Sequence, residues 1–209
     1  MRKNVKLNDI LTISRGASPR PIAKYITTNS NGINWIKIGD VKQDSFFITK
    51  TDEKITPEGA KKSRYVKPGD FILSNSMSFG RPYILQIYGC VHDGWLILSD
   101  YEKNVTSLYL YYLLKSTVVQ NQFYGSANGS TVRNLNSDIV RDVTVCIHSD
   151  FEVQQQIVNH LNLIQAAIDT KQQQLKELDE LVKSRFIEMK IVPHGFDFAN
   201  AKSVLREVV

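Results

Sequence analysis

The chain has 209 residues, of which 42% are hydrophobic and 10% aromatic, and it carries a formal net charge of +5. This composition is typical of one folded domain with an extension, or of two small domains, and it disfavours a mainly disordered chain. No apolar run approaches the roughly 20 residues that cross a bilayer, and no signal-peptide core precedes Asp9, so we expect a cytoplasmic protein without membrane contact. The only cysteines are Cys90 and Cys146, without a CxxC or Cys/His cluster, which disfavours a zinc site and a disulfide framework.

The charge is unevenly distributed along the chain. Residues 1–149 contain 19 Lys/Arg and 12 Asp/Glu, whereas residues 150–190 contain 5 and 7. A basic N-terminal part joined to a mildly acidic C-terminal part favours a polyanionic partner such as nucleic acid for the first part. A domain that is basic without such a partner is the alternative.

Short β-strands punctuated by turns are expected in the N-terminal part. The runs are rich in β-branched and aromatic residues and are bounded by Gly, Asp, Asn or Pro. They are INWIKIGDV (33–41), DSFFITK (44–50), GDFILSN (69–75), PYILQIYGCV (82–91) and HDGWLILS (92–99). One helix, TSLYLYYLLKSTVVQNQFYG, is expected to begin at Thr106 or Ser107 and to end at Gly125. The predicted fold class is therefore α+β, with a mixed, β-rich domain.

A long helix is predicted after this domain, because no glycine or proline occurs from Phe151 to Lys190. Its apolar residues recur at heptad spacing, which indicates a coiled coil or a helix-packing seam. We expect a dimerisation seam of Ile157, Leu161, Ile164, Ile168, Leu175, Leu178, Val182 and Met189. A helix from another molecule is the preferred partner, and a helix folded back on its own domain is the alternative. Residues 191–209 form a tail to which we assign no role.

Motifs for catalysis are weak in this sequence. The stretch SNSMSFGRP (74–82) lacks the leading glycine of a GxSxG nucleophile elbow, and neither a Walker loop nor a GxGxxG fingerprint is present. Asp52, Glu53 and Lys54, with Asp70, could serve a metal-dependent nuclease, but a solvated turn is the preferred explanation of the triplet. The histidines are not spaced as metal ligands, and Trp35 and Trp95 are expected in the core. No metal site is predicted.

Features of nucleic-acid binding are more numerous. Three loop-like stretches combine small residues, hydroxyl or amide groups and at least one arginine. They are SRGASPRPIAKY (14–25), SNSMSFGRP (74–82) and YGSANGSTVRNL (124–135). Glycine in such loops lets the backbone approach phosphate closely. Together they favour a nucleic-acid interface.

Six segments in a fixed order carry a resemblance to a known family. They are LNDILTISRGASP, WIKIGDV, KPGDFILSNSMSFGRPYI, VHDGWL, GSTVRNLNSDIVRDVTV and QQQIVNHLNLIQAAID…LKELDELVKSRFIEM. Over roughly residues 5–190 the chain resembles the specificity (S) subunit of type I restriction-modification enzymes, with a target recognition domain followed by a spacer helix. Two local departures are Asp150, where the family usually has proline, and Val153-Gln154, where it usually has Glu-Gln.

The resemblance implies a target recognition domain over residues 1–149 and a helical spacer or dimerisation region over 150–190. It implies recognition of one half of a bipartite site in double-stranded DNA. The partners implied are a methyltransferase (M) subunit and a restriction (R) subunit. S-adenosylmethionine would belong to the M subunit, with no cofactor and no catalytic activity in this chain. One recognition domain and one helix resemble half of such a subunit, and a homodimer of two halves would favour an interrupted palindrome.

Two other functions remain open on the sequence. One is a standalone metal-dependent DNA endonuclease, and the other is a decoy that captures methyltransferase subunits without supporting methylation. Under the preferred hypothesis SNSMSFGRP faces DNA, while a buried turn that joins two strands is the alternative. The predicted DNA-binding residues are Arg15, Ser18, Arg20, Lys24, Lys37, Ser74, Asn75, Ser76, Ser78, Arg81, His92, Asp93, Ser126, Asn128, Ser130, Thr131 and Arg133.

Overall fold

The computed structural model describes residues 1–41, 45–75, 79–126 and 134–188. The chain divides into two units, Met1–Val158 and Asn159–Val209. The division falls within the long helix α5 (Phe151–Glu188), so the first two turns of that helix belong to the first unit. Within the described ranges, no helix has both the length and the apolar character that a membrane span requires.

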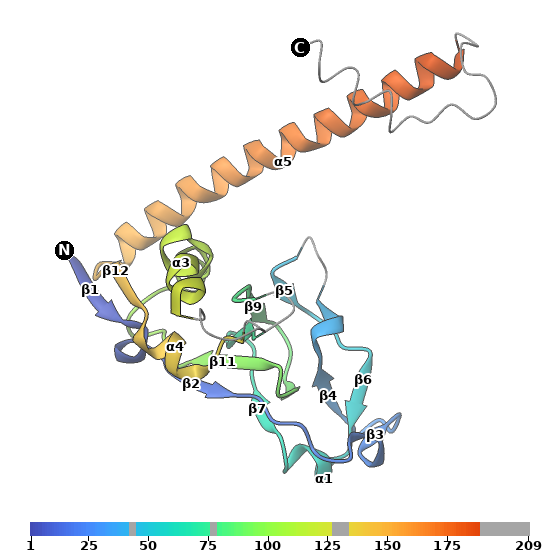
Figure 1. Ribbon diagram of the computed structural model, residues 1–209, viewed down its shortest axis with the longest axis vertical. Helices are drawn as coiled ribbons and strands as arrows, with labels where there is room; N and C mark the ends of the chain where they lie inside the picture. The colour runs from blue at the N-terminus through green and yellow to red at the C-terminus, as the bar shows by residue number, and fades with distance from the viewer. Residues whose placement is uncertain (42–44, 76–78, 127–133, 189–209) are drawn as a thin grey trace. The chain divides into compact units, whose positions relative to one another are not determined.

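The first unit contains two five-stranded sheets and a two-stranded pair (Figure 1). The central sheet has the order β2-β11-β8-β9-β5, and its strands are β2 (Thr12–Arg15), β5 (Phe47–Ile48), β8 (Phe71–Ser74), β9 (Pro82–Leu85) and β11 (Trp95–Ser99). The second sheet has the order β3-β6-β4-β10-β7, and its strands are β3 (Ile26–Thr27), β4 (Ile33–Ile36), β6 (Glu53–Ile55), β7 (Arg64–Val66) and β10 (Gly89–Val91). Antiparallel β1 (Arg2–Lys6) and β12 (Thr144–His148) form the pair.

The central sheet is buried on both faces. In β8, Phe71 and Leu73 pack into a core with the helices, whereas Ile72 between them packs into a second core. That second core also contains Ile36 and Val91 of the second sheet. Because side chains alternate across a strand, a strand covered on both faces is apolar at nearly every position. This burial explains the continuous apolar runs of the sequence and gives the unit three layers: helices, central sheet and second sheet.

The helices of the first unit are short. They are α1 (Pro57–Ala60), α2 (Ser107–Lys115), α3 (Thr117–Ser126) and α4 (Ser137–Asp142), with 3-10 turns at Leu7–Asp9, Ile22–Lys24 and Ile38–Asp40. The single helix predicted from Thr106 to Gly125 is wrong, because Ser116 has an extended backbone (ψ 147°) that ends α2. The Ser116 hydroxyl then accepts a hydrogen bond from the Val119 N–H at 3.4 Å, so one serine ends α2 and caps α3.

The single strand predicted over 82–91 is also two strands. Residues 82–85 form β9 of the central sheet, and residues 89–91 form β10 of the second sheet. The chain therefore passes from one layer to the next at residues 86–88. Both segments are apolar because both lie in buried sheets, which is why the sequence does not distinguish them.

Gln154 fastens the start of α5 to the first unit. Its side chain is fully buried, and its Oε1 accepts a hydrogen bond from the Thr106 N–H at 2.8 Å. Its Nε2 donates to the carbonyls of His148 at 2.8 Å and Asn104 at 3.1 Å. A single amide thus satisfies backbone groups from the loop before α2 and from the end of β12, which would otherwise be buried without partners.

The apolar seam predicted on α5 is divided between the two units. Ile157 was expected in the dimerisation seam, but it packs against the helical core of the first unit, next to the buried Val158. Leu161 is half-buried, and Met189 lies outside the described residues. The remaining seam residues are exposed large hydrophobic side chains: Ile164, Ile168, Leu175, Leu178 and Val182. In the second unit, Ile164, Ala167, Ile168, Lys171, Gln172 and Leu175 line a groove of about 380 Å³.

Replacing Gln154 by alanine should lower the free energy of unfolding by about 2–4 kcal/mol, because three buried backbone groups lose their partner. Chemical denaturation of the variant would measure this loss. The matched control is Gln156→Ala, since Gln156 is exposed on the same helix and should change stability by no more than about 0.5 kcal/mol. Equal stabilities of the two variants would contradict the fastening function of Gln154.

Candidate nucleic-acid interface

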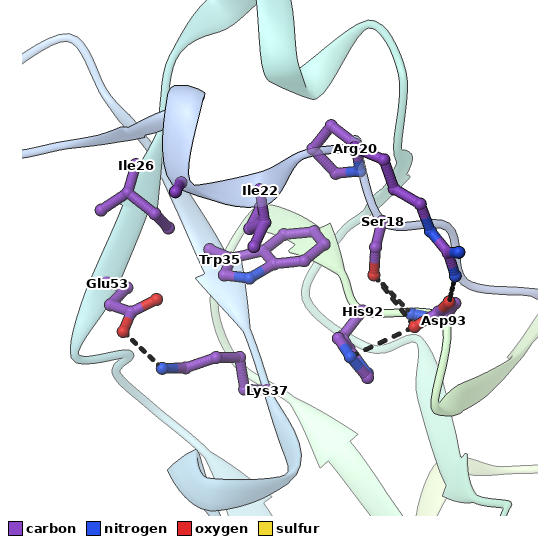
Figure 2. A pocket seen from close by; sticks show the side chains of 11 residues that line it. Ser18, Arg20, Ile22, Ile26, Trp35, Lys37, Glu53, His92 and Asp93 are labelled. Carbon is purple, nitrogen blue, oxygen red and sulfur yellow. Dashed lines mark hydrogen bonds and ion pairs between the residues drawn. The ribbon is translucent and has the colours of Figure 1, made fainter.

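A pocket lies on the side of the second sheet that faces away from the central sheet. On that side Trp35, Ile55 and Cys90 form a third core, against which Ile22 and Tyr25 pack. The pocket has a volume of about 550 Å³. Figure 2 shows its lining residues, which are Ser18, Pro19, Arg20, Ile22, Ala23, Ile26, Trp35, Lys37, Glu53, His92 and Asp93. An apolar wall between two polar groups of side chains suits a ligand that is partly planar and apolar and partly polar at its edges.

Close packing of two backbone segments builds the polar end of the pocket. Strand β2 pairs with β11, with Arg15 opposite Leu96, and the Gly16 N–H continues the pairing by donating to the Trp95 carbonyl at 2.9 Å. A Cβ atom on Gly16 would lie 2.2 Å from the carbonyl oxygen of His92. Only glycine allows this approach, and the approach brings the segment after β2 beside His92 and Asp93.

Asp93 is the centre of the hydrogen bonds at this end (Figure 2). Its Oδ1 accepts from the Ser18 hydroxyl at 3.0 Å, and its Oδ2 lies 3.1 Å from Nη2 of Arg20. The Nε2 atom of His92 lies 3.1 Å from the same Oδ1. Asp93 also uses its backbone, because its N–H donates to Ser18 at 3.2 Å and its carbonyl accepts from Nε of Arg15 at 3.0 Å. Four side chains from two distant segments therefore meet at one residue.

These contacts lower the pKa of the Asp93 carboxyl. Burial by itself would raise the pKa of Asp93, but the hydrogen bond from Ser18, together with the nearby His92 imidazole and Arg20 guanidinium, outweighs it and lowers the pKa below the ordinary 3.8. The Gly94 N–H donates to Nδ1 of His92 at 2.9 Å. In the neutral imidazole that nitrogen is the acceptor, and the proton is carried by Nε2, the atom that faces Asp93.

The opposite polar group is an ion pair. The Nζ atom of Lys37 lies 2.6 Å from Oε1 of Glu53, and each side chain is a little more than one third exposed, at 35% and 39%. A paired lysine and glutamate present a donor and an acceptor side by side. Both kinds of group can contact the edge of a base pair in a DNA groove.

The structure brings five of the predicted residues together in the lining of this pocket: Ser18, Arg20, Lys37, His92 and Asp93. Arg15 does not line the pocket, but its Nε donates to the carbonyl of Asp93. Lys24 is exposed at the end of the 3-10 turn Ile22–Lys24 and does not line the pocket. Arg81 is exposed at another position, where its guanidinium carbon lies 5.4 Å from the centre of the Tyr83 ring.

The predicted DNA contacts of Ser74 and Asn75 are corrected by their burial, at 0% and 5% exposure. Ser74 lies in β8, and the backbone of Asn75 bonds to Gly94 and Leu135, so this part of SNSMSFGRP joins strands as the alternative hypothesis expected. The side chain of Ser126 is not described. The other predicted residues lie outside the described ranges: Ser76, Ser78, Asn128, Ser130, Thr131 and Arg133.

Sequence reasoning missed the apolar wall and one half of the ion pair. Trp35, Ile22 and Ile26 line the pocket, yet an apolar residue in a strand or turn carries no signal that distinguishes a pocket wall from a core. Glu53 was considered only for a nuclease. Its place opposite Lys37 follows from the antiparallel pairing of β4 with β6, which sets Trp35 opposite Glu53.

The described residues do not provide the grouping of side chains that a metal-dependent nuclease requires. Among them, no three His, Cys, Asp or Glu side chains are grouped as a metal site would require. Glu53 is engaged with Lys37, and Asp70 is buried in the turn before β8, where its Oδ2 accepts from the Lys67 N–H at 2.9 Å. Burial raises the pKa of Asp70, which is the opposite of what a metal-binding carboxylate needs.

Comparison with known proteins identifies the class of protein. The family described as "Type I restriction modification DNA specificity domain" matches residues 2–180. This match covers most of the chain, so the chain belongs to that family. It is a DNA specificity domain, and specificity subunits are the non-catalytic components of these enzymes.

Individual relatives agree with this assignment. The Type I restriction enzyme MjaIX specificity subunit of Methanocaldococcus jannaschii is 26% identical over 194 residues, which cover 88% of this chain and 44% of that protein. A solved chain from a study of complex assembly and conformational transition of the type I R-M system superposes with a TM-score of 0.70 at 18% identity, over 88% of this chain and 43% of that one.

The HsdS subunit from Thermoanaerobacter tengcongensis superposes with a TM-score of 0.61 at 18% identity, over 81% of this chain and 38% of that one. At such identities the superpositions establish the fold. They support the predicted α+β class, with mixed sheets followed by a long helix. The chain spans less than half the length of each of these relatives.

The Asp93 carboxyl should titrate below 3.8 in the folded chain. A pKa lower in the folded than in the unfolded state stabilises the fold above the unfolded pKa, and this contribution is lost as the pH falls through the folded pKa. Ser18→Ala should move the pKa of Asp93 upward, because it removes a hydrogen bond to the charged form. NMR titration of the Asp93 carboxyl carbon measures its pKa in the unmodified chain and in Ser18→Ala. The control variant is Ser45→Ala, which removes a serine hydroxyl elsewhere. An unchanged titration in Ser18→Ala would contradict the hydrogen-bonding scheme.

Proposed function

We propose that this chain recognises one half of a bipartite DNA site and directs a methyltransferase subunit, and with it a restriction subunit, to that site. The cofactor for methylation, S-adenosylmethionine, would be bound by the methyltransferase subunit. The observation that carries the proposal is the convergence of Ser18, Arg20, Lys37 and His92 in one pocket of a DNA specificity domain, with Arg15 bonded to the Asp93 carbonyl beside them.

Charge and side-chain chemistry support the DNA-binding part of the proposal. Residues 1–149 carry 19 Lys/Arg against 12 Asp/Glu, which favours association with phosphate. Around the pocket, arginine and lysine are suited to phosphates and guanine edges, while Ser18 and Glu53 offer acceptors for the amino groups of bases. Affinity and discrimination could thus be supplied from the same surface.

The second unit supports pairing through α5. Five apolar side chains of the seam are exposed, and α5 is far longer than the helices of the first unit, at 38 residues or roughly 57 Å. An exposed apolar seam at heptad spacing is stable in water when a second helix covers it. We propose that the helix of a second copy of this chain does so, which gives a homodimer with two recognition units.

Mapping of methylated adenines tests the recognition function. Co-expression of this chain with the methyltransferase subunit of a type I system should produce methylation at an interrupted palindrome, because two identical units would recognise two identical half-sites. An asymmetric bipartite site would support DNA recognition but replace the homodimer by pairing with a different half. A stable complex that methylates no DNA would contradict the proposed function and favour a decoy.

Pairing through the seam is tested separately by Ile168→Asp. A carboxylate at this position would have to be buried in the helix–helix interface, so we expect dimerisation to weaken by about 2 kcal/mol or more, roughly thirtyfold in the dissociation constant. Analytical ultracentrifugation of the full chain measures the change.

The control variant is Ala166→Asp, which introduces the same charge on the same helix outside the seam, at an exposed position. It should leave the dimer intact. A wild-type chain that is monomeric at all accessible concentrations would refute the homodimer, and equal effects of the two variants would refute the assignment of the seam.

A further inference from the structure

A carboxylate at the centre of a DNA-binding surface requires an explanation, because DNA repels negative charge. Asp93 was predicted as a polar DNA contact. In the structure its two carboxylate oxygens already serve three partners: Ser18, His92 and Arg20. A carboxylate has about four acceptor positions, so most of its capacity is used within the protein. Asp93 is therefore poorly suited to direct recognition of a base.

The groups that surround Asp93 are suited to DNA. Arg20 is 82% exposed at its side chain, and its guanidinium reaches back to Oδ2 of Asp93. Arg15 is exposed as well and is tied to the carbonyl oxygen of the same residue. An arginine that is held before binding loses less rotamer freedom when it contacts a phosphate or a base. One residue thus contacts two exposed cations, Arg15 at the end of β2 and Arg20 in the segment that follows it.

The position of Asp93 is itself held firmly. Its N–H donates to Ser18, its carboxylate receives the Ser18 hydroxyl, and Gly16 allows the two backbones to approach. His92 is fixed by the hydrogen bond from the Gly94 N–H to its Nδ1 and by the contact of its Nε2 with Asp93. An anchor needs this rigidity if it is to hold a flexible side chain in one direction.

We propose that Asp93 is a positioning residue for DNA binding, which orients Arg20 through its carboxylate and Arg15 through its backbone carbonyl, and does not itself contact DNA. This inference rests on the proposed DNA-recognition function. If Asp93 orients cations, removing its charge should weaken DNA binding. If it only adds negative charge, removing that charge should tighten binding.

The test is the binding of the full-length variant Asp93→Asn to a fluorescent duplex pool randomised over one half-site. If Asp93 acts only through its charge, removing the charge should tighten binding to the polyanion. If it positions Arg20, binding should weaken by about tenfold, as expected when a charge-assisted hydrogen bond is lost. The matched control is Glu102→Gln, which removes an exposed negative charge elsewhere on the unit and should leave binding equal or tighter.

A double-mutant cycle shows whether the effect passes through Arg20. Arg20→Ala should weaken binding and reduce the magnitude of the negative slope of log K against log salt by about one. In that background, Asp93→Asn should add less than about a twofold further loss, because its partner is already gone. A full additional loss, or tighter binding by Asp93→Asn alone, would overturn the inference.

Failure of the proposed function gives a different result. If the wild-type chain and all variants fail to bind the duplex pool, DNA recognition and the positioning function both fall. If the wild-type chain binds and Asp93→Asn binds more tightly, only the positioning function falls. If Asp93→Asn does not fold, NMR relaxation of the Arg20 Nε–H group in the wild-type chain tests the proposal instead. A positioned guanidinium should be ordered, and a disordered one would refute the proposal.

Discussion

Burial of the central sheet on both faces is the constraint from which the rest of the first unit follows. Phe71 and Leu73 must be covered by helices, and Ile72 between them must be covered by a second sheet. Once that second sheet is in place, its other face is free to carry Trp35 and a pocket. The three layers thus supply a rigid support for the candidate interface, which is built from short loops and strand ends.

The cations of the pocket are held in place by carboxylates, which the amino-acid composition does not predict. Lys37 is held by Glu53, and Arg20 by Asp93. Each acid reduces the net positive charge and so reduces nonspecific attraction to DNA, but each also limits the directions in which its partner can point. Discrimination between sequences depends on such fixed directions, whereas nonspecific affinity depends on charge alone.

The long helix α5 contributes both to the stability of the recognition unit and to the proposed pairing. Its first two turns are part of the first unit, where Gln154 satisfies three backbone groups and Val158 lies in the core. Its later turns carry exposed apolar side chains such as Ile168 and Leu175. One uninterrupted element therefore serves the stability of the recognition unit and presents the surface proposed for pairing.

The sequence by itself determined the features that depend on neighbouring residues. The apolar runs of β8 and β11, the absence of breakers in α5 and the α+β class follow from local periodicity and turn chemistry. Part of the site was also foreseeable, since Ser18 and Arg20 lie in a polar, loop-like stretch, whereas Lys37 and Asp93 lie in runs predicted as strands. Burial was not foreseeable, because Ser74 and Asn75 belong to an equally polar stretch and lie inside the unit.

Only the tertiary structure decided which of these residues meet. Ser18 and Asp93 are 75 positions apart, and they are joined by the pairing of β2 with β11 and by the contact of Gly16 with His92. Strand pairing and a missing Cβ atom act across space, so no periodicity along the chain reports them. The division of one apolar run into β9 and β10 has the same origin, because membership in a sheet is settled by the partner strand and not by the strand's own residues.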